Sequence, residues 1–369
     1  MKTWDAIIVG AGPAGCAAAY DLAVAGHEVL LIDKADFPRQ KACAGGLTIK
    51  AARALRYSIE PVVRQKIASM RIERGEGRAT IVRRHSPYCF MTVRQEFDDF
   101  CLRQTLSAGA QFQRIRAIEA ITSESAGVTI SADGERLHAR FLVGADGVHS
   151  RVRQLTNMGA GWIWRGFAVE ATVPVPNAAA HDLVFDFAAI RCGYGWVFPK
   201  ADHLNIGLYS FAGGEAIDRA RLSAYIRNRS IGSGAECIIG QHAAFGATQH
   251  KPAIGRIFLA GDAGGFVDPL TGEGIYFAIV SGQAAARAIE RDFASGISAH
   301  EEFARATARI RTDLGIATSG AHWFYQNLDV GYRLLSVPVL HRFLLNGFAD
   351  GSDLASLAGR VKTLISNLA

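Results

Sequence analysis

The sequence lacks the long apolar run that a membrane-spanning helix needs. No uncharged apolar stretch in its 369 residues reaches the roughly 18 residues that would cross a bilayer. Residues 6–20 are apolar enough to suggest a signal peptide, but Asp5, Pro13 and glycines at fixed spacing argue against one. We therefore expect no transmembrane helix and a cytoplasmic protein with at most peripheral membrane contact.

Two further absences argue against a zinc site and against nucleic-acid binding. The six cysteines are scattered and form no Cys-x-x-Cys pair, so we expect no metal and a reducing compartment. The net charge is +6, yet no Lys/Arg-rich run of the kind that binds DNA or RNA is present. An anionic cofactor or a membrane surface would use this excess of basic charge more readily than nucleic acid would.

Glycines at fixed spacing follow a predicted buried strand near the N-terminus. Residues 6–9 are apolar, Gly10-x-Gly12-x-x-Gly15 follows, and after an Ala-rich helix a second apolar strand ends at Asp33. The first glycine permits a tight turn, the second lets backbone N–H groups approach a pyrophosphate, and the third allows close helix–strand packing. Asp33 is placed to accept hydrogen bonds from a ribose. This unit predicts a dinucleotide site that would suit NAD or FAD.

Two later Gly-Asp segments favour FAD. Asp146 follows a predicted strand in a Gly-Ala-Asp-Gly turn, and Asp262 follows Gly261 at the end of another strand. An acid at such a strand end can meet a ribitol hydroxyl while the helix start that follows faces a phosphate. Either segment alone could be an ordinary turn capped by an aspartate, but both together downstream of the glycine segment favour a flavin site.

Longer segments resemble one group of flavoenzymes. With the three segments above, they resemble the flavin-dependent aromatic hydroxylase superfamily, which has the p-hydroxybenzoate hydroxylase fold, and more narrowly the geranylgeranyl reductase family. The resemblance covers residues 1 to about 290 and leaves the C-terminal part without a recognised motif. The segments that carry it are Phe37-Pro-Arg-Gln-Lys-Ala-Cys-Ala-Gly-Gly-Leu47, Val93-Arg-Gln-Glu-Phe-Asp98, Gly193-Tyr-Gly-Trp-Val-Phe-Pro-Lys200 and residues 262–275.

The length and the lack of any repeat or linker predict two interleaved domains. The expected fold is α/β: a Rossmann-like FAD-binding domain, an α+β substrate domain built on a β-sheet, and a helical C-terminal tail. We assign residues 1–72, 94–157 and 250–300 to the FAD-binding domain, 73–93 and 158–249 to the substrate domain, and 301–369 to a helical cap. Residues 43–68 are expected to alternate between helix and loop.

The resemblance implies further cofactor-binding residues. In the family, the arginine at the position of Arg94 contacts the FAD phosphates, which a guanidinium can do bidentately. Residues 262–274 would lie along the flavin, where backbone N–H groups can face the N1/O2 edge that becomes negative on reduction. The predicted cofactor-binding residues are Gly10, Gly12, Pro13, Ala14, Gly15, Asp33, Lys34, Lys41, Arg94, Asp146, Gly261, Asp262, Gly272, Gly274 and Ile275.

The resemblance also places Cys43 close to the flavin ring. Its role there would be to shape the pocket or to donate a proton, and the alternative is a buried structural thiol, the commoner fate of a free cysteine. The family usually has Cys-Gly-Gly-Gly, whereas Ala44 follows Cys43 in this chain.

Aromatic residues alternate along the strand predicted near residue 196. Tyr194, Trp196 and Phe198 would share one face at strand period. In the reductases this segment borders the substrate cavity, so Tyr194 and Trp196 are predicted pocket residues; the alternative is an aromatic core strand. The family tends to show Gly-x-Gly where this chain has Gly207-Leu-Tyr209, which leaves the shape of the cavity open.

Two reactions fit this site. As a reductase, the protein would transfer hydride from N5 of reduced flavin to a carbon–carbon double bond of an isoprenoid or similar lipid. As a monooxygenase, it would form a C4a-hydroperoxide and hydroxylate an aromatic substrate, either a small molecule or a protein-bound Trp or Tyr. A third hypothesis, a flavoprotein that serves as a binding or sensor module, is disfavoured by the intact flavin-edge segment. The electron donor would be NAD(P)H or an electron-donor protein that binds transiently.

Overall fold

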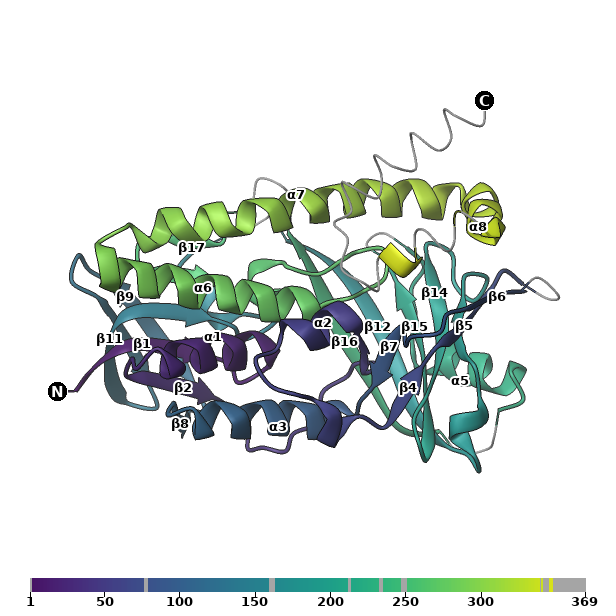
Figure 1. Cartoon of the computed structure of the whole chain (residues 1–369), viewed down its shortest axis with the longest axis horizontal. Coiled ribbons are helices and arrows are strands. Elements are labelled where there is room, and N and C mark those ends of the chain that lie inside the picture. The colour runs from purple at the N-terminus through teal and green to yellow at the C-terminus, as the bar shows by residue number, and fades with distance from the viewer. Residues whose placement is uncertain are drawn as a thin grey trace.

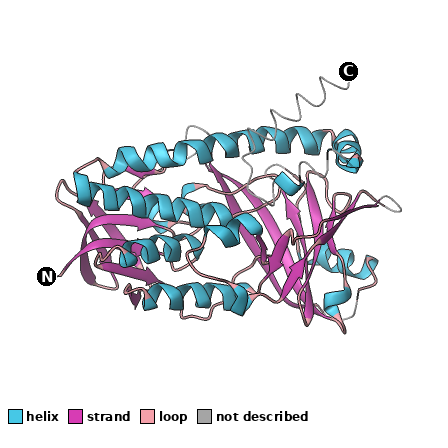
Figure 2. Cartoon of the chain, viewed as in Figure 1, coloured by secondary structure: helices cyan, strands magenta, loops and turns pink. Residues whose placement is uncertain are grey.

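Two large β-sheets lie at opposite ends of the molecule, and long helices run along one side of both (Figures 1 and 2). A third, three-stranded sheet completes the core. This mixed arrangement confirms the predicted α/β class with a helical C-terminal region. The computed structural model describes residues 2–75, 79–158, 163–211, 214–231, 235–246, 251–338, 340 and 345–347.

The first sheet is built around the strand that precedes the glycine segment. Its central strands are parallel, in the order β18 (Ile257–Leu259), β11 (Glu135–Gly144), β1 (Thr3–Val9), β2 (Val29–Asp33) and β8 (Gln111–Arg114). β1 and β2 are almost wholly buried, as expected for parallel strands covered on both faces. The antiparallel strands β9 (Ile118–Ser123), β10 (Val128–Ala132) and β17 (Ala253–Ile254) extend the sheet.

Helix α1 (Pro13–Val24) connects β1 to β2 and packs closely against α6 (Ile275–Ser295) and α3 (Arg94–Ser107). A Cβ on Gly282 would lie 2.2 Å from the carbonyl oxygen of Ala14, so α6 can approach α1 this closely only with glycine there. The strand–helix–strand unit is therefore formed as the sequence predicts, and α6 holds the start of α1 in place.

The second sheet has the order β16 (Glu236–Gly246), β12 (Ile163–Pro174), β15 (His203–Ser210), β14 (Gly193–Pro199), β13 (Leu183–Asp186), β5 (Ser69–Glu73) and β6 (Ala79–Arg83). Neighbouring strands are antiparallel except for β13 and β5, which are parallel. β14 is buried along its whole length. The proposed change of domain at residues 72–73 falls within β5, whose strand continues to Glu73.

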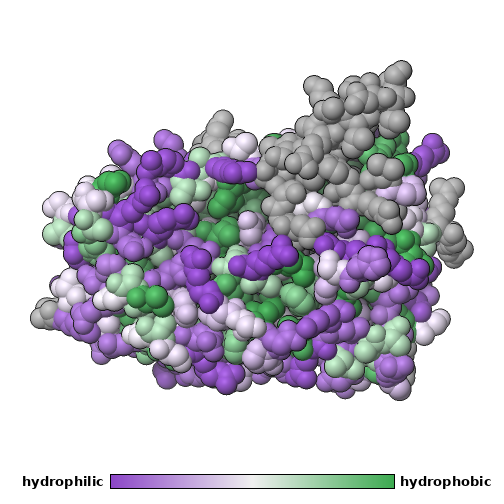
Figure 3. All heavy atoms as spheres, in the orientation of Figure 1, coloured by the Kyte–Doolittle hydropathy of each residue, from purple (hydrophilic) through white to green (hydrophobic). Residues whose placement is uncertain are grey.

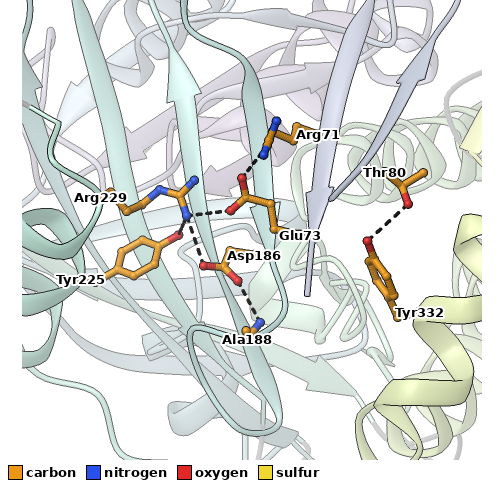
Figure 4. Close-up of polar contacts among 8 residues, drawn as sticks. All are labelled: Arg71, Glu73, Thr80, Asp186, Ala188, Tyr225, Arg229 and Tyr332. Atoms are coloured by element: carbon orange, nitrogen blue, oxygen red, sulfur yellow. Dashed lines mark hydrogen bonds and ion pairs between the residues drawn. The ribbon is translucent and has the colours of Figure 1, made fainter. Parts of the chain in front are cut away.

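An arginine joins the two parallel strands of this sheet. Arg229, which follows α5 (Arg219–Asn228), donates from Nη1 to Glu73 at 2.9 Å and to Asp186 at 3.2 Å (Figure 4). Glu73 and Asp186 are direct register partners on β5 and β13. Two carboxylates at facing positions repel each other, so the shared guanidinium is what allows this pairing.

The segment expected to alternate between helix and loop contains short strands, which corrects that expectation. β3 (Gly46–Thr48) and β4 (Gln65–Ile67) pair with β7 (Cys89–Met91) in the small sheet, and only α2 (Ile49–Ala54) and the turn η1 (Glu60–Val62) are helical. Strands of three residues are too short to show an alternating pattern in the sequence. The remaining short helical elements are α4 (Arg151–Leu155), η2 (Ala178–Ala180) and η3 (Gly261–Gly264).

The C-terminal region contains α7 (Ala299–Gln326), which packs along α6, and α8 (Leu328–Ser336). α8 is tied to β6, because Thr80 Oγ1 lies 3.3 Å from Tyr332 Oη (Figure 4). The same oxygen lies 3.1 Å from Ser336 Oγ. The helical cap is thus present over the described part of 301–347, and residues 348–369 of the predicted cap lie outside the described residues.

The visible surface is mostly hydrophilic, with smaller hydrophobic areas between the polar side chains (Figure 3). Exposed large apolar side chains include Trp323, Val330 and Val337 on and beside the last two helices. Within the described ranges, none of the helices is both long enough and apolar enough to cross a bilayer.

Candidate active site

A cavity of about 1760 Å³ extends from the glycine segment after β1 to the face of the second sheet. Cavities for single small molecules usually measure roughly 300–1,000 Å³, so this one has room for a large cofactor and a second ligand. Among the predicted site residues, only Gly15 does not line it. Those that do are Gly10, Gly12, Pro13, Ala14, Asp33, Lys34, Lys41, Cys43, Arg94, Asp146, Tyr194, Trp196, Gly261, Asp262, Gly272, Gly274 and Ile275.

The three glycines after β1 have different surroundings. Gly10 has a φ of +102°, and a Cβ there would lie 2.4 Å from the carbonyl oxygen of Ala145. A Cβ on Gly15 would lie 1.8 Å from the carbonyl oxygen of Gly10, so this glycine permits packing. At Gly12 the nearest atom to such a Cβ is Nη2 of Arg39 at 3.5 Å. Gly12 therefore leaves open the space that a phosphate would need in front of α1.

Asp33 organises this glycine loop. Its carboxylate accepts the N–H of Ala11 at 2.7 Å and the N–H of Ala35 at 2.9 Å. An ionised carboxylate can accept about four hydrogen bonds, so two positions are left for hydroxyl groups in the cavity. This geometry is compatible with the predicted ribose contact.

Asp146 caps a helix. Its carboxylate accepts hydrogen bonds from Ser150 Oγ at 2.6 Å, from the N–H of Arg151 at 2.6 Å and from the N–H of Val152 at 3.1 Å, at the start of α4. These are the contacts of the ordinary capped turn that the sequence also allowed. Burial raises the pKa of Asp146, and these hydrogen bonds oppose the rise.

Opposite charges face one another where the cavity passes Gly261. Burial raises the pKa of the Asp262 carboxyl, and the nearby Lys41 and Arg94 oppose this effect. Burial lowers the pKa of Lys41, and Asp262 opposes that effect in turn. Two cations beside one acid make this part of the cavity suitable for an anionic ligand.

Arg94 is held mainly by a carboxylate of its own helix. Its Nε and Nη2 donate to the two oxygens of Asp98 at 2.7 and 2.8 Å, and Arg39 Nη2 reaches the same carboxylate at 3.1 Å. Because Arg39 also lies in front of Gly12, it is a second candidate phosphate contact. The sequence carried Arg39 inside a family segment without assigning it a role.

Three tyrosine hydroxyls hold the loop that precedes α6. Tyr209 donates to the carbonyl oxygen of Pro269 at 2.9 Å, Tyr325 donates to that of Leu270 at 2.8 Å, and Tyr194 donates to that of Thr271. Burial raises the pKa of all three phenols, so they stay protonated as donors at neutral pH. Tyr194 thus lines the cavity as predicted, but its hydroxyl holds the loop.

The loop that carries Cys43 contacts the second sheet through two buried charged residues that the sequence analysis assigned no role. Glu170 accepts the N–H of Cys43 at 2.9 Å, and Lys200 donates to the carbonyl oxygen of Ala44 at 2.6 Å. Cys43 itself lines the cavity and is half-buried. Glu170 is a single charged residue within a strand and Lys200 directly follows one, and neither position shows a sequence pattern that indicates a role.

Aromatic side chains form the wall of the cavity at the second sheet. Tyr194, Trp196 and Phe198 share one face of β14, with ring centroids 6.1 and 6.4 Å apart, and Phe185 packs 5.3 Å from Phe198. Trp196 covers Gly207 of β15, where a Cβ would lie 2.1 Å from the indole ring. The far end of this chamber is lined by Ile316, Ala317, Phe324, Leu334 and Leu335 of α7 and α8.

The residues present fit an FAD. Gly12 leaves room beside a helix start, and a Cβ added at Gly272 or Gly274 would have no neighbour closer than 3.4 Å, so a ligand can approach the backbone there closely. Arg39 lies in front of Gly12 and Lys41 interacts with Asp262, so positive charge is available in the cavity for a diphosphate. The cavity then continues into an apolar chamber with room for a substrate.

Comparison with known proteins agrees with this geometry. Residues 3–290 match the family model described as an FAD binding domain. An uncharacterized protein of Methanosarcina barkeri is 32% identical over 100% of this chain and 96% of its own length. The geranylgeranyl diphosphate reductase of Rhodobacter capsulatus is 31% identical over 82% of this chain and 79% of its own.

The fold is likewise found among solved structures. The crystal structure of a geranylgeranyl bacteriochlorophyll reductase-like protein from Thermoplasma acidophilum superposes with a TM-score of 0.81 at 21% identity. The match covers 99% of this chain and 100% of the other, so the C-terminal helices belong to the shared fold. The chain belongs to the FAD-binding family and, within it, to the geranylgeranyl reductase family.

Proposed function

We propose that this protein is an FAD-dependent reductase that saturates carbon–carbon double bonds of an isoprenoid or similar lipid. The observation that carries the proposal is the continuity of one cavity from the nucleotide loop to a large apolar chamber. A polar small molecule would gain little from walls made of Phe185, Trp196 and Phe324, whereas an unsaturated hydrocarbon chain would bury its surface there. The relative from Rhodobacter capsulatus, named for a geranylgeranyl substrate, supports this substrate class.

In this mechanism FAD, when bound, supplies the hydride for one carbon of the double bond. The protein positions that carbon: the wall of Tyr194, Trp196 and Phe198 holds the chain flat, and α7 and α8 exclude water from its remote part. Cys43 lines the cavity and is half-buried, which supports a role for its thiol in holding the proton that the second carbon requires.

We propose that the electron donor binds transiently. The sequence has one Gly-x-Gly-x-x-Gly segment, and its Gly10 and Gly12 line the cavity that we assign to FAD. A nicotinamide nucleotide or a small electron-donor protein would therefore reach the flavin from the cavity mouth. We also propose that any membrane contact is peripheral. A lipid substrate would enter beside α8, where the side chains of Val330 and of Val337, which follows the helix, are exposed.

The test compares two reactions of the same enzyme. The purified FAD-loaded protein is reduced without oxygen and mixed with a polyprenyl lipid or with air, and the products are identified by mass spectrometry. Reoxidation by the lipid with gain of hydrogen supports the proposal. Oxygen consumption matched by gain of an oxygen atom on an aromatic substrate would instead establish the monooxygenase alternative and overturn the proposal.

A further inference from the structure

Glu170 connects the Cys43 loop to the wall of the chamber. It lies on β12, is 6% exposed, and accepts the N–H of Cys43 at 2.9 Å. A hydrogen bond from the Asn205 side chain also reaches the Glu170 carboxylate, and Asn205 Oδ1 accepts the indole N–H of Trp196 at 2.7 Å. A chain of hydrogen bonds therefore runs from Trp196 through Asn205 and Glu170 to the backbone of Cys43.

Lys200 fixes the other side of the same loop. It directly follows β14, is 2% exposed, and donates from Nζ to Ala44 at 2.6 Å and to Thr92 at 2.7 Å, in both cases to the carbonyl oxygen. Gly45 has a φ of +68°, and a Cβ there would lie 2.1 Å from the Thr92 carbonyl oxygen and 2.7 Å from this nitrogen, so the loop can pass only with glycine there. The side chain thus crosses from the second sheet to the Cys43 loop and to the segment that follows β7.

These contacts determine where the Cys43 side chain points. Glu170 holds the peptide group before Cys43, and Lys200 holds the carbonyl of the next residue. The N–H of Gly45 also lies 3.4 Å from Cys43 Sγ. With the backbone fixed on both sides of the residue, the direction of its Cα–Cβ bond is fixed as well.

Burying the charges of Lys200 and Glu170 costs free energy. Removing an ammonium and a carboxylate from water carries a penalty that their attraction only partly offsets. Burial lowers the pKa of Lys200 to about 8 and raises the pKa of Glu170, and each charge partly opposes the shift of the other. An apolar contact could hold a loop without that penalty, but it would not set the orientation of individual peptide groups.

We propose that Glu170 and Lys200 are positioning residues that orient the Cys43 thiol toward the substrate carbon. The hydrogen-bond chain from Trp196 then links the orientation of this thiol to the aromatic wall of the chamber. This inference rests on the proposed function for the identity of the reaction, but the position of Cys43 can be measured without it. Both residues hold backbone groups of the loop, so in this proposal they act on the thiol through the loop.

The test measures Cys43 directly in the FAD-loaded protein. Iodoacetamide alkylation is followed by peptide mass spectrometry, with the exposed Cys237 as internal reference. In Glu170→Ala and Lys200→Met we expect the rate at Cys43 to change several-fold, because the released loop alters access to the thiol. FAD content should stay at the wild-type level. Glu170→Gln, which keeps an acceptor oxygen, should restore the rate, and Glu290→Ala at an exposed position of α6 is the control.

Turnover on a polyprenyl lipid provides the second readout. We expect kcat to fall on the order of 10- to 100-fold in Glu170→Ala with KM little changed, as for a misplaced reacting group. Wild-type alkylation and wild-type kcat in both variants would overturn the inference. Altered alkylation in a protein that reduces no lipid would uphold the positioning and refute the proposed function. If Glu170→Ala does not fold, Glu170→Met, which keeps the length but has no acceptor, takes its place.

Discussion

The hydroxyl of Tyr325 donates a hydrogen bond to the carbonyl oxygen of Leu270 at 2.8 Å. Tyr325 lies near the end of α7, and Leu270 lies in the loop that precedes α6 and lines the cavity. The C-terminal region, for which the sequence offered no motif, is thereby attached to the segment expected along the flavin. The C-terminal helices are consequently tied to a loop that lines the cavity.

Replacing Tyr325 by phenylalanine should weaken FAD binding. The change leaves the buried Leu270 carbonyl without its donor, which costs about 1–3 kcal/mol. We expect a several-fold higher Kd for FAD, measured by fluorescence titration of the apoprotein. Tyr332→Phe is the control, because its hydroxyl meets Thr80 on β6 instead of the loop. Equal FAD affinity in wild type and Tyr325→Phe would show that the loop needs no such support.

Alanine at two glycines of the nucleotide loop should have different consequences. At Gly12 a Cβ has no neighbour within 3.4 Å, so the apoprotein of Gly12→Ala should keep its stability and lose FAD. At Gly15 a Cβ would meet the Gly10 carbonyl at 1.8 Å, so Gly15→Ala should lose a few kcal/mol of unfolding free energy even without FAD. Urea unfolding of both apoproteins and flavin absorbance after purification distinguish these effects. A yellow Gly12→Ala protein with normal flavin content would refute the phosphate assignment.

The sequence predicted best those parts of the fold that depend on short segments of chain. The strand–helix–strand unit expected at the N-terminus coincides with β1, α1 and β2. It is specified by local signals: short apolar runs and the glycine spacing between them. The small sheet was missed because its strands of three residues gain stability only from partners distant in the sequence.

The candidate site divides in the same way. The glycine and aspartate positions that line the cavity could be named because their chemistry is written in adjacent residues. The link between Cys43 and Glu170 spans 127 positions, and that between Lys200 and Ala44 spans 156. Such pairs are brought together by the packing of two sheets. A single sequence does not show which buried charged residue will contact which loop.

The stability of the protein should depend on pH through Lys200. Burial lowers its pKa in the folded state from 10.5 to about 8, so between these values the unfolded chain binds more protons than the folded protein. Stability from this group therefore rises as pH increases through that window, and its burial penalty of about 3 kcal/mol is fully present below pH 8. The charged or titratable groups that face it are Cys43, Cys89 and Glu170.

The measurement compares wild type with Lys200→Met by chemical unfolding at a pH below 8 and at one near 10. Wild type should gain roughly 2 kcal/mol relative to the variant at the higher pH, because the variant has no group to deprotonate at this site. Ionisable groups that do not face Lys200 are common to both proteins and cancel in the difference. A difference that does not vary with pH would mean that the ammonium of Lys200 is as easily accommodated in the folded state as in water.

Alanine at Gly207 should reduce the space available to long substrates. A Cβ there would lie 2.1 Å from the indole of Trp196, which is 4% exposed and lines the chamber, so the ring would have to move. Displacing the ring would also strain its hydrogen bond to Asn205, and overpacking of this kind costs about 1–3 kcal/mol.

We expect turnover of a long polyprenyl lipid to fall about tenfold and that of a short one to fall less, with normal FAD content. An equal loss on long and short substrates would place the effect of Gly207→Ala in the fold of the sheet, and unchanged turnover on both would remove Trp196 from the substrate wall.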